Sequence, residues 1–259
     1  MTWPFRRRLR RSRDPGSRVV AGVRWIGRIL RWSFRLLLVF IIVDLFYVAT
    51  QWPDWDALQK GSIPKSNFIL SYQRDLKKPR HKNLPPLRWR PVSYDKIPQH
   101  MIRAVVVAED SRFYQHDGFD LIAFREAMDQ NLSRGKLAFG ASTISQQTVK
   151  NLFLTGSRDF LRKWHELLLT WGMERNLKKR RIMELYLNIA EFGKGIYGVE
   201  AASLHYWNKP VSQVTWRQAA ELAACLPSPK KHNPTTRTPA FERRVDKIYY
   251  WLMQNQNGT

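Results

Sequence analysis

The stretch from Pro98 to Ser111, PQHMIRAVVVAEDS, marks the point where the chain becomes helical, and it carries the most informative acid. Met101, Val105 and Glu109 follow one another at intervals of four residues, so a helix places them in one stripe. A carboxylate that continues an apolar stripe loses water, which raises its pKa and suits it to accept a proton. Spacing alone also allows a solvated acid at a helix end, because Asp110 follows directly.

Downstream of Pro98 the sequence predicts a mainly α-helical body. Apolar residues recur at helical spacing, and little of the chain alternates with a period of two. The expected helices cover residues 98–111, 119–133, 142–153, 159–177, 179–190, 198–207, 215–225 and 239–254. We therefore expect a helical domain over residues 98–259 without a large sheet.

The segment upstream of this domain has a different character. Residues 53–97 are rich in proline and polar residues, which predicts a linker or membrane-proximal segment. Short strands are expected within it around Phe68–Tyr72 and Leu87–Val92.

An apolar segment before the linker predicts a membrane anchor. Residues 32–52, WSFRLLLVFIIVDLFYVATQW, match the length of about 20 residues that a helix needs to cross a bilayer. Trp32 and Trp52 bracket the segment as interfacial aromatics would. The alternatives are a cleaved signal peptide, against which the lack of a small-residue cleavage pattern argues, and a buried core helix, which Asp44 supports.

The chain carries a formal net charge of +23, from 44 basic and 21 acidic residues. Eleven arginines lie at or before Arg35, so the tail 1–31 is strongly basic, which predicts a cytoplasmic N-terminus and an exported domain. Residues 51–259 still hold 33 basic and 19 acidic residues. This excess indicates a polyanionic partner, and for an exported domain we expect a membrane surface or a phosphorylated substrate rather than nucleic acid.

Cations and amides lie between Glu109 and a second acid, Glu166. They are Gln146, Gln147, Lys150, Asn151 and Arg158. Such groups suit a diphosphate, because charge-assisted hydrogen bonds stabilise its departure. Two acids flanking an anion site would suit glycosyl transfer. Glu166 also has an ordinary explanation, since Arg162 and Lys163 precede it by four and three residues, as in a helix ion pair.

Three further patterns do not lead to a function. Gly193–Gly198 (GKGIYG) matches G-x-G-x-x-G, but the residues before it have helical spacing where a dinucleotide site needs a strand. Ser62–Lys65 (SIPK) has the S-x-x-K form without K-T-G or S-D-N partners. The six histidines and the single Cys225 show no metal-ligand spacing.

Five motifs in order across residues 98–236 resemble those of the peptidoglycan glycosyltransferases. They are Glu109–Gly118 (EDSRFYQHDG), Gly140–Gln147 (GASTISQQ), Arg162–Glu166 (RKWHE), Lys179–Asn188 (KRRIMELYLN) and Leu222–Pro229 (LAACLPSP). With an anchor before them and no second catalytic domain, the chain is similar to the monofunctional biosynthetic branch of this family. Ala141, Ser145 and Trp207 depart from the family pattern without removing a proposed charge.

The resemblance implies a lysozyme-like helical fold and an enzyme that polymerises lipid II into β-1,4-linked glycan strands, with inversion and release of undecaprenyl diphosphate. Glu109 would deprotonate the acceptor hydroxyl, and Glu166 would lie near the leaving diphosphate. Substrate contacts would come from Ser142, Gln146, Gln147, Lys150, Arg158, Arg162 and Lys163. The shape of the site would depend on Asp110, Phe113, His116, Gly118 and Asn188.

The implied partners are lipid II, the lipid-linked strand and the membrane, with cell-division or other cell-wall synthesis proteins as further candidates and no nucleic acid. Mg²⁺ or Mn²⁺ bridging the diphosphate, with Glu166 in contact, is the candidate cofactor. The implied location is the inner membrane, crossed once, with a periplasmic domain.

The function and the role of one apolar segment both have alternatives. A muramidase or lytic transglycosylase that cleaves strands is one alternative function, and a non-enzymatic cell-wall scaffold is another. Apolar residues of 119–139 either contact lipid or form the core side of a helix; they are Phe119, Leu121, Phe124, Leu132, Leu137 and Phe139.

Overall fold

The structure is a computed structural model that describes residues 15–135, 140, 142–154, 156 and 159–254. The chain divides into two compact units, Met1–Pro53 and Asp54–Thr259, and each is described by itself.

From residue 15 on, where the structure describes it, the first unit is formed by one long helix, α1 (Pro15–Thr50). Within it, Gly27–Thr50 has a mean hydropathy of 2.0 and is long and apolar enough to cross a membrane. Large side chains along this part are exposed, among them Phe34 (61%) and Phe46 (72%). The helix begins upstream of the predicted anchor, so residues 15–31 of the expected basic tail are helical as well.

The second unit is built mainly from helices at the predicted positions. They are α4 (Gln99–Glu109), α5 (Leu121–Arg134), α6 (Ile144–Phe153), α7 (Phe160–Asn176), α8 (Lys179–Ile189), α9 (Val199–Trp207), α10 (Trp216–Cys225) and α11 (Pro239–Gln254). The mainly α-helical prediction is confirmed. Several helices begin later than expected because a polar residue caps them; Asp120, Thr143, Asp159 and Thr215 each accept a backbone N–H three residues on.

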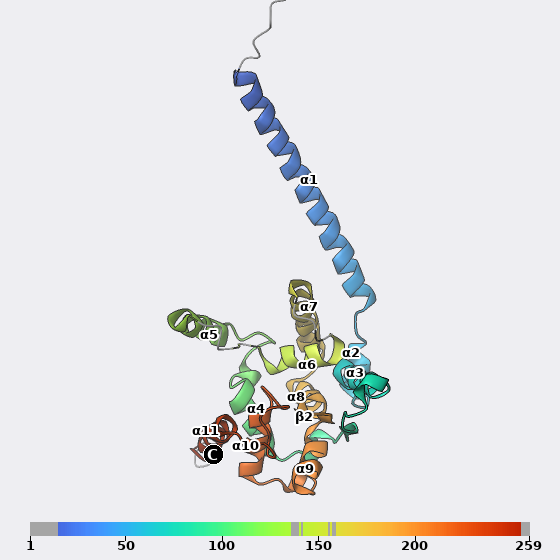
Figure 1. Cartoon of the computed structure of the whole chain (residues 1–259), viewed down its shortest axis with the longest axis vertical. Coiled ribbons are helices and arrows are strands. Elements are labelled where there is room, and N and C mark those ends of the chain that lie inside the picture. The colour runs from blue at the N-terminus through green and yellow to red at the C-terminus, as the bar shows by residue number, and fades with distance from the viewer. Residues whose placement is uncertain (1–14, 136–139, 141, 155, 157–158, 255–259) are drawn as a thin grey trace, which may run out of the picture. The chain divides into compact units, whose positions relative to one another are not determined.

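The core of this unit lies around α8 (Figure 1). Almost every residue of α8 is buried, and α6 and α9 pack against it. α10 packs against both α4 and α11, while α6 also contacts α7. The end of α4 and one face of α6 are therefore fixed by the core, and these are the two places where the sequence predicts functional side chains.

Residues 54–97, expected to be a linker, belong to the same compact unit as the helical body. Asn188 on α8 holds them in place: its Oδ1 accepts from Val92 N at 2.7 Å, and its Nδ2 donates to Val92 O at 2.9 Å. The segment contains α2 (Trp55–Lys60) and α3 (Asn67–Leu76).

The strand expected over Phe68–Tyr72 is wrong, because these residues lie in α3. The Ser66 side chain accepts from Ile69 N at 3.2 Å and starts the helix. Ile69 and Tyr72 are then buried three residues apart on one face, where they pack against Tyr197.

The strand expected near residues 87–92 is present as β1 (Arg88–Trp89), in a small sheet of order β1-β3-β2. β3 (Ile196–Tyr197) runs parallel to β1, with Arg88 opposite Ile196, and antiparallel to β2 (Glu191–Gly193). The glycine run that matches G-x-G-x-x-G thus lies in a β2–β3 hairpin that follows a helix. A dinucleotide fingerprint instead lies in the turn between a strand and a helix of a βαβ unit.

α5 and α7 extend away from the core (Figure 1). The described side chains of α5 are half-buried or exposed, and Leu121 and Leu132 are 75% and 74% exposed. For Leu121, Phe124 and Leu132 this contradicts the alternative that they form the core side of a helix, whereas Phe119 lies before α5 and is half-buried. Leu137 and Phe139 lie outside the described residues.

Candidate active site

Glu109 is the last residue of α4, and only 10% of its side-chain surface is exposed. Its Oε2 accepts from Gln147 Nε2 at 2.9 Å, and its Oε1 accepts from Arg244 Nη2 at 2.8 Å. Burial raises the pKa of Glu109, while hydrogen bonds from Gln147 and the charge of Arg244 oppose that rise. Of the two possibilities that the spacing leaves open, the structure thus has the desolvated carboxylate at the end of the stripe that begins with Met101 and Val105.

Gln147 links Glu109 to α8. Its Oε1 accepts from the Tyr186 hydroxyl at 3.2 Å, while its Nε2 donates to Glu109. Burial raises the pKa of Tyr186, so the phenol stays protonated and keeps donating. The two bonds fix the orientation of the Gln147 amide, which in turn aims the Glu109 carboxylate.

The turn after Glu109 is held by Asp110. Its carboxylate accepts from Ile144 N at 3.0 Å and from His116 Nε2 at 3.0 Å. His116 Nδ1 accepts from Gly118 N at 3.1 Å, an arrangement that places the imidazole proton on Nε2. Gly118 has a φ of +90°, and a Cβ there would lie 2.9 Å from side-chain carbons of α7. The expected ordering of this turn by His116 is confirmed.

Phe113 completes the packing of the turn. It is fully buried, and its ring lies edge-on to those of Tyr114 and His116. Lys179 Nζ lies 4.6 Å from its ring centroid. Phe113 thus fixes the turn against the start of α8, just as Asn188 fixes the upstream segment.

Two of the residues at the start of α6 form a capping box. Thr143 and Gln146 cap the helix reciprocally: Thr143 Oγ1 accepts from Gln146 N at 3.2 Å, and Gln146 Oε1 accepts from Thr143 N at 3.0 Å. Gln146 is buried and its side-chain oxygen completes the cap, so it stabilises the start of the helix. Its role as a substrate contact stays a prediction. Ser142 is exposed and lines a pocket of about 210 Å³ together with Glu109.

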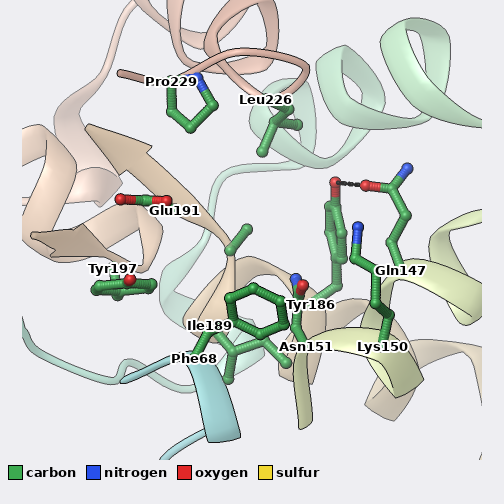
Figure 2. A pocket seen from close by; sticks show the side chains of 11 residues that line it. Phe68, Gln147, Lys150, Asn151, Tyr186, Ile189, Glu191, Tyr197, Leu226 and Pro229 are labelled. Atoms are coloured by element: carbon green, nitrogen blue, oxygen red, sulfur yellow. Dashed lines mark hydrogen bonds between the residues drawn. The ribbon is translucent and has the colours of Figure 1, made fainter. Parts of the chain in front are cut away.

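Gln147 and Lys150 line a second pocket of about 160 Å³, which we call the Lys150 pocket. Figure 2 shows them on one side of the pocket and Glu191 with Tyr197 on the other. The spacing of three residues predicted that Gln147 and Lys150 share a helix face, and this is confirmed. Since Gln147 also bonds to Glu109, the pocket lies next to the buried acid.

Lys150 is half-buried, and its charge depends on nearby acids. Burial lowers the pKa of Lys150, and the charges of Glu166 and Glu109 raise it. Both predicted acids are thus near enough to influence this lysine. They help to keep it protonated, as a cation that binds a phosphate must be.

Glu166 is buried on α7, with 3% exposure. Its Oε2 accepts from Arg162 Nη1 at 2.7 Å, and its Oε1 accepts from Lys163 Nζ. The helix ion pairs that the sequence offers as the ordinary explanation are therefore present. Arg158, the other predicted cation, lies outside the described residues.

Neither Glu166, which was expected to contact a diphosphate-bound cation, nor a described cluster of possible ligands around Asp110 fits a divalent cation. At Glu166 both carboxylate oxygens are already bonded to cationic side chains. Asp110, His116 and Asp120 bring ligand atoms within 4.8 Å of one another, but Arg112 bonds to both oxygens of Asp120 at 2.8 and 2.9 Å. We therefore derive no step through a protein-bound metal.

Arg244 is a site residue that the sequence reasoning missed. From α11 its Nη2 donates to Ala108 O at 3.0 Å and to Glu109 Oε1 at 2.8 Å. The available signal was the phase of α11, since position 244 lies three residues after buried Phe241 and four before buried Ile248. This spacing places Arg244 at the edge of the buried face of α11. It does not show that Glu109 is the group that Arg244 contacts.

Comparisons with known proteins agree with this geometry. A family model described as Transglycosylase matches residues 81–253. Three curated relatives share the name biosynthetic peptidoglycan transglycosylase. The one from Nitrosospira multiformis is 38% identical over 221 residues, covering 84% of this chain and 94% of the relative. The relative from Marinomonas sp. is 43% identical over 228 residues, which cover 88% of this chain and 91% of the relative. The relative from Thiobacillus denitrificans is 39% identical over 230 residues, which cover 88% of this chain and 95% of the relative.

Proposed function

Because this chain belongs to the biosynthetic peptidoglycan transglycosylases, we propose that it polymerises lipid II into β-1,4-linked glycan strands, with inversion and release of undecaprenyl diphosphate. It is a peptidoglycan glycosyltransferase with a lysozyme-like helical domain. The observation that carries the chemical proposal is the buried, doubly hydrogen-bonded Glu109 next to the Lys150 pocket.

Glu109 acts as the general base. Its carboxylate accepts the proton of an acceptor sugar hydroxyl while the hydroxyl oxygen attacks the anomeric carbon of the donor. The bond from that carbon to the diphosphate breaks, and its electron pair leaves with the diphosphate oxygen. Attack from the face opposite the leaving group inverts the anomeric centre. The raised pKa of Glu109 makes it a stronger base than an ordinary carboxylate.

Lys150 stabilises the leaving diphosphate. It is the cation of the described pocket next to Glu109, and positive charge there offsets the negative charge that develops as the glycosidic bond breaks. Arg162 and Lys163 bond to Glu166, so this acid orients two further cations of the same helix. Arg158 stays a predicted contact on sequence grounds alone.

A divalent cation stays a proposal and is assigned to the diphosphate itself, since the protein groups near Glu166 do not fit one. Mg²⁺ or Mn²⁺ bound to a diphosphate would neutralise part of its charge. Polymerisation measured with and without a chelator tests this assignment.

The membrane is the proposed location because the substrate is lipid-linked. The apolar helix Gly27–Thr50 supports an anchor, and the arginines before it support a cytoplasmic N-terminus and a periplasmic domain at the inner membrane. Exposed apolar residues of α5, such as Leu121 and Leu132, support contact of the domain with lipid. Cell-division and other cell-wall synthesis proteins stay candidate partners.

The deciding experiment incubates lipid II with the wild-type protein and with Glu109→Gln. Polymer and free lipid diphosphate from the wild type alone support the proposal. Shortening of added glycan strands without polymer would instead identify the strand-cleaving alternative. Equal polymer from both proteins would remove Glu109 from the mechanism, because loss of a general base costs about 10²- to 10⁴-fold in rate.

A further inference from the structure

A cavity of about 500 Å³ lies on the side of Glu109 that faces α11, and we call it the α4–α11 cavity. Its lining includes Ala108 at the end of α4, Ser111 in the turn that follows, and Arg244, Lys247, Ile248 and Trp251 on α11. Its volume is within the range of about 300–1,000 Å³ typical of small-ligand sites. The mechanism above gives it no role.

The α4–α11 cavity carries positive charge that the protein does not neutralise. Lys247 is exposed and forms no ion pair with any residue in the described part of the chain. The neighbouring acid, Asp246, is turned to α10, where it bonds to Arg217 at 3.1 Å. Among the residues that the structure describes, Arg244 forms an ion pair with Glu109 alone. An anionic ligand would therefore find an unpaired ammonium group beside a guanidinium.

Apart from Ser111, the remaining lining is mainly apolar. Ala108 and Ile248 form part of the wall, and the indole of Trp251, 48% exposed, forms another part. A diphosphate is best bound by donors on all sides, whereas a peptide carboxylate is attached to aliphatic groups that gain from contact with such a wall. The combination favours a carboxylate on a short peptide.

Arg244 connects the cavity to the reaction. It lines the cavity and also donates to the Glu109 oxygen, so an acceptor whose hydroxyl reaches Glu109 brings its own substituents close to this lining. When Glu109 takes up a proton, Arg244 loses the negative charge it faces. A carboxylate bound in the cavity would then compensate the guanidinium.

We propose that the α4–α11 cavity binds a carboxylate of the peptide carried by the acceptor, with Lys247 as the main cationic contact. This inference rests on the proposed function and identifies a second part of the acceptor, besides its sugar, that the enzyme recognises.

The test uses the full chain with Lys247→Gln, a substitution of an exposed side chain that leaves the fold intact. Polymerisation kinetics are measured with lipid II that carries its natural peptide and with lipid II whose peptide carboxylates are converted to carboxamides. With the natural substrate, we expect Lys247→Gln to raise KM by about three- to tenfold, the effect of losing one partly exposed charge contact. With the amidated substrate, the wild type and the variant should have the same raised KM.

Arg243→Gln is the matched control, because Arg243 is an exposed cation on the same helix that does not line the cavity. It should keep the wild-type KM for both substrates. An unchanged KM for the natural substrate in Lys247→Gln overturns the inference, and so does an equal rise for both substrates. Failure of the wild type to polymerise either substrate would instead refute the proposed function.

Discussion

Replacing Arg244 by glutamine should move the acidic limb of the pH–rate profile to higher pH. The Arg244 guanidinium lies 2.8 Å from Glu109 Oε1 and lowers the pKa of this acid against the effect of burial. Without that charge the pKa of Glu109 rises further, so the base is ionised only at higher pH. The acidic limb of kcat/KM, which reports ionisation in the free enzyme, should follow.

The magnitude follows from the contact. An opposite charge at this distance typically shifts a carboxyl pKa by about 1–3 units. The side chain of Arg244 is 36% exposed, and solvent screening places the expected shift at the lower end. We expect about one unit, equivalent to about 1.4 kcal/mol, so that kcat/KM below the limb falls about tenfold.

The assay is initial-rate polymerisation of lipid II across the pH range, with the midpoint of the acidic limb as the readout. The midpoint separates an effect on Glu109 from an effect on substrate binding, which changes the height of the profile instead. Arg244→Lys keeps the charge and should restore most of the midpoint, while Arg243→Gln should leave it unchanged. An unmoved or lowered midpoint in Arg244→Gln would refute the electrostatic role of this arginine.

Three further predictions concern the site and its support. Glu109→Gln should abolish polymerisation, yet it should raise the free energy of unfolding that urea denaturation measures at neutral pH. The pKa of Glu109 is raised in the folded protein, so its ionised form destabilises the native state. This destabilisation disappears as the pH falls below 4.5, the pKa of the unfolded chain. A less stable variant at neutral pH would contradict this. Lys150→Ala should lower turnover with an unchanged thermal melt, and wild-type turnover would remove it from the diphosphate site. Asn188→Ala should leave the backbone N–H and C=O of Val92 without their partner, and it should lower the free energy of unfolding by about 1–3 kcal/mol for each buried group left unpaired. A loss well below that range would mean that water replaces the amide.

The helices of the body could be predicted closely because their signals are local. Apolar spacing sets the buried face, and residues such as Thr143 and Thr215 set the first turn through their own side chains. Residues 68–72 were misread as a strand because a short apolar run suits either structure. There the Ser66 cap and the packing of Tyr72 on Tyr197 decide for a helix.

The site could be predicted only in part. Glu109 and the shared face of Gln147 and Lys150 follow from spacing within single helices. The contact of Glu109 with Arg244 joins positions 135 residues apart in the chain, and only packing of α11 near α4 creates it. The capping role of Gln146 was not predicted, because a glutamine that caps a helix and one that faces a ligand look alike in sequence.

A carboxylate restrained at both oxygens cannot rotate to meet its substrate. Each Glu109 oxygen already accepts one hydrogen bond, so the remaining lone pairs point in fixed directions. A sugar offers several hydroxyls of similar acidity, and its own chemistry does not distinguish them well. With Glu109 as the base that we propose, we expect the regiochemistry of the linkage to depend on how firmly Gln147 and Arg244 hold its carboxylate. Loosening either contact should then give mixed linkages as well as slower synthesis.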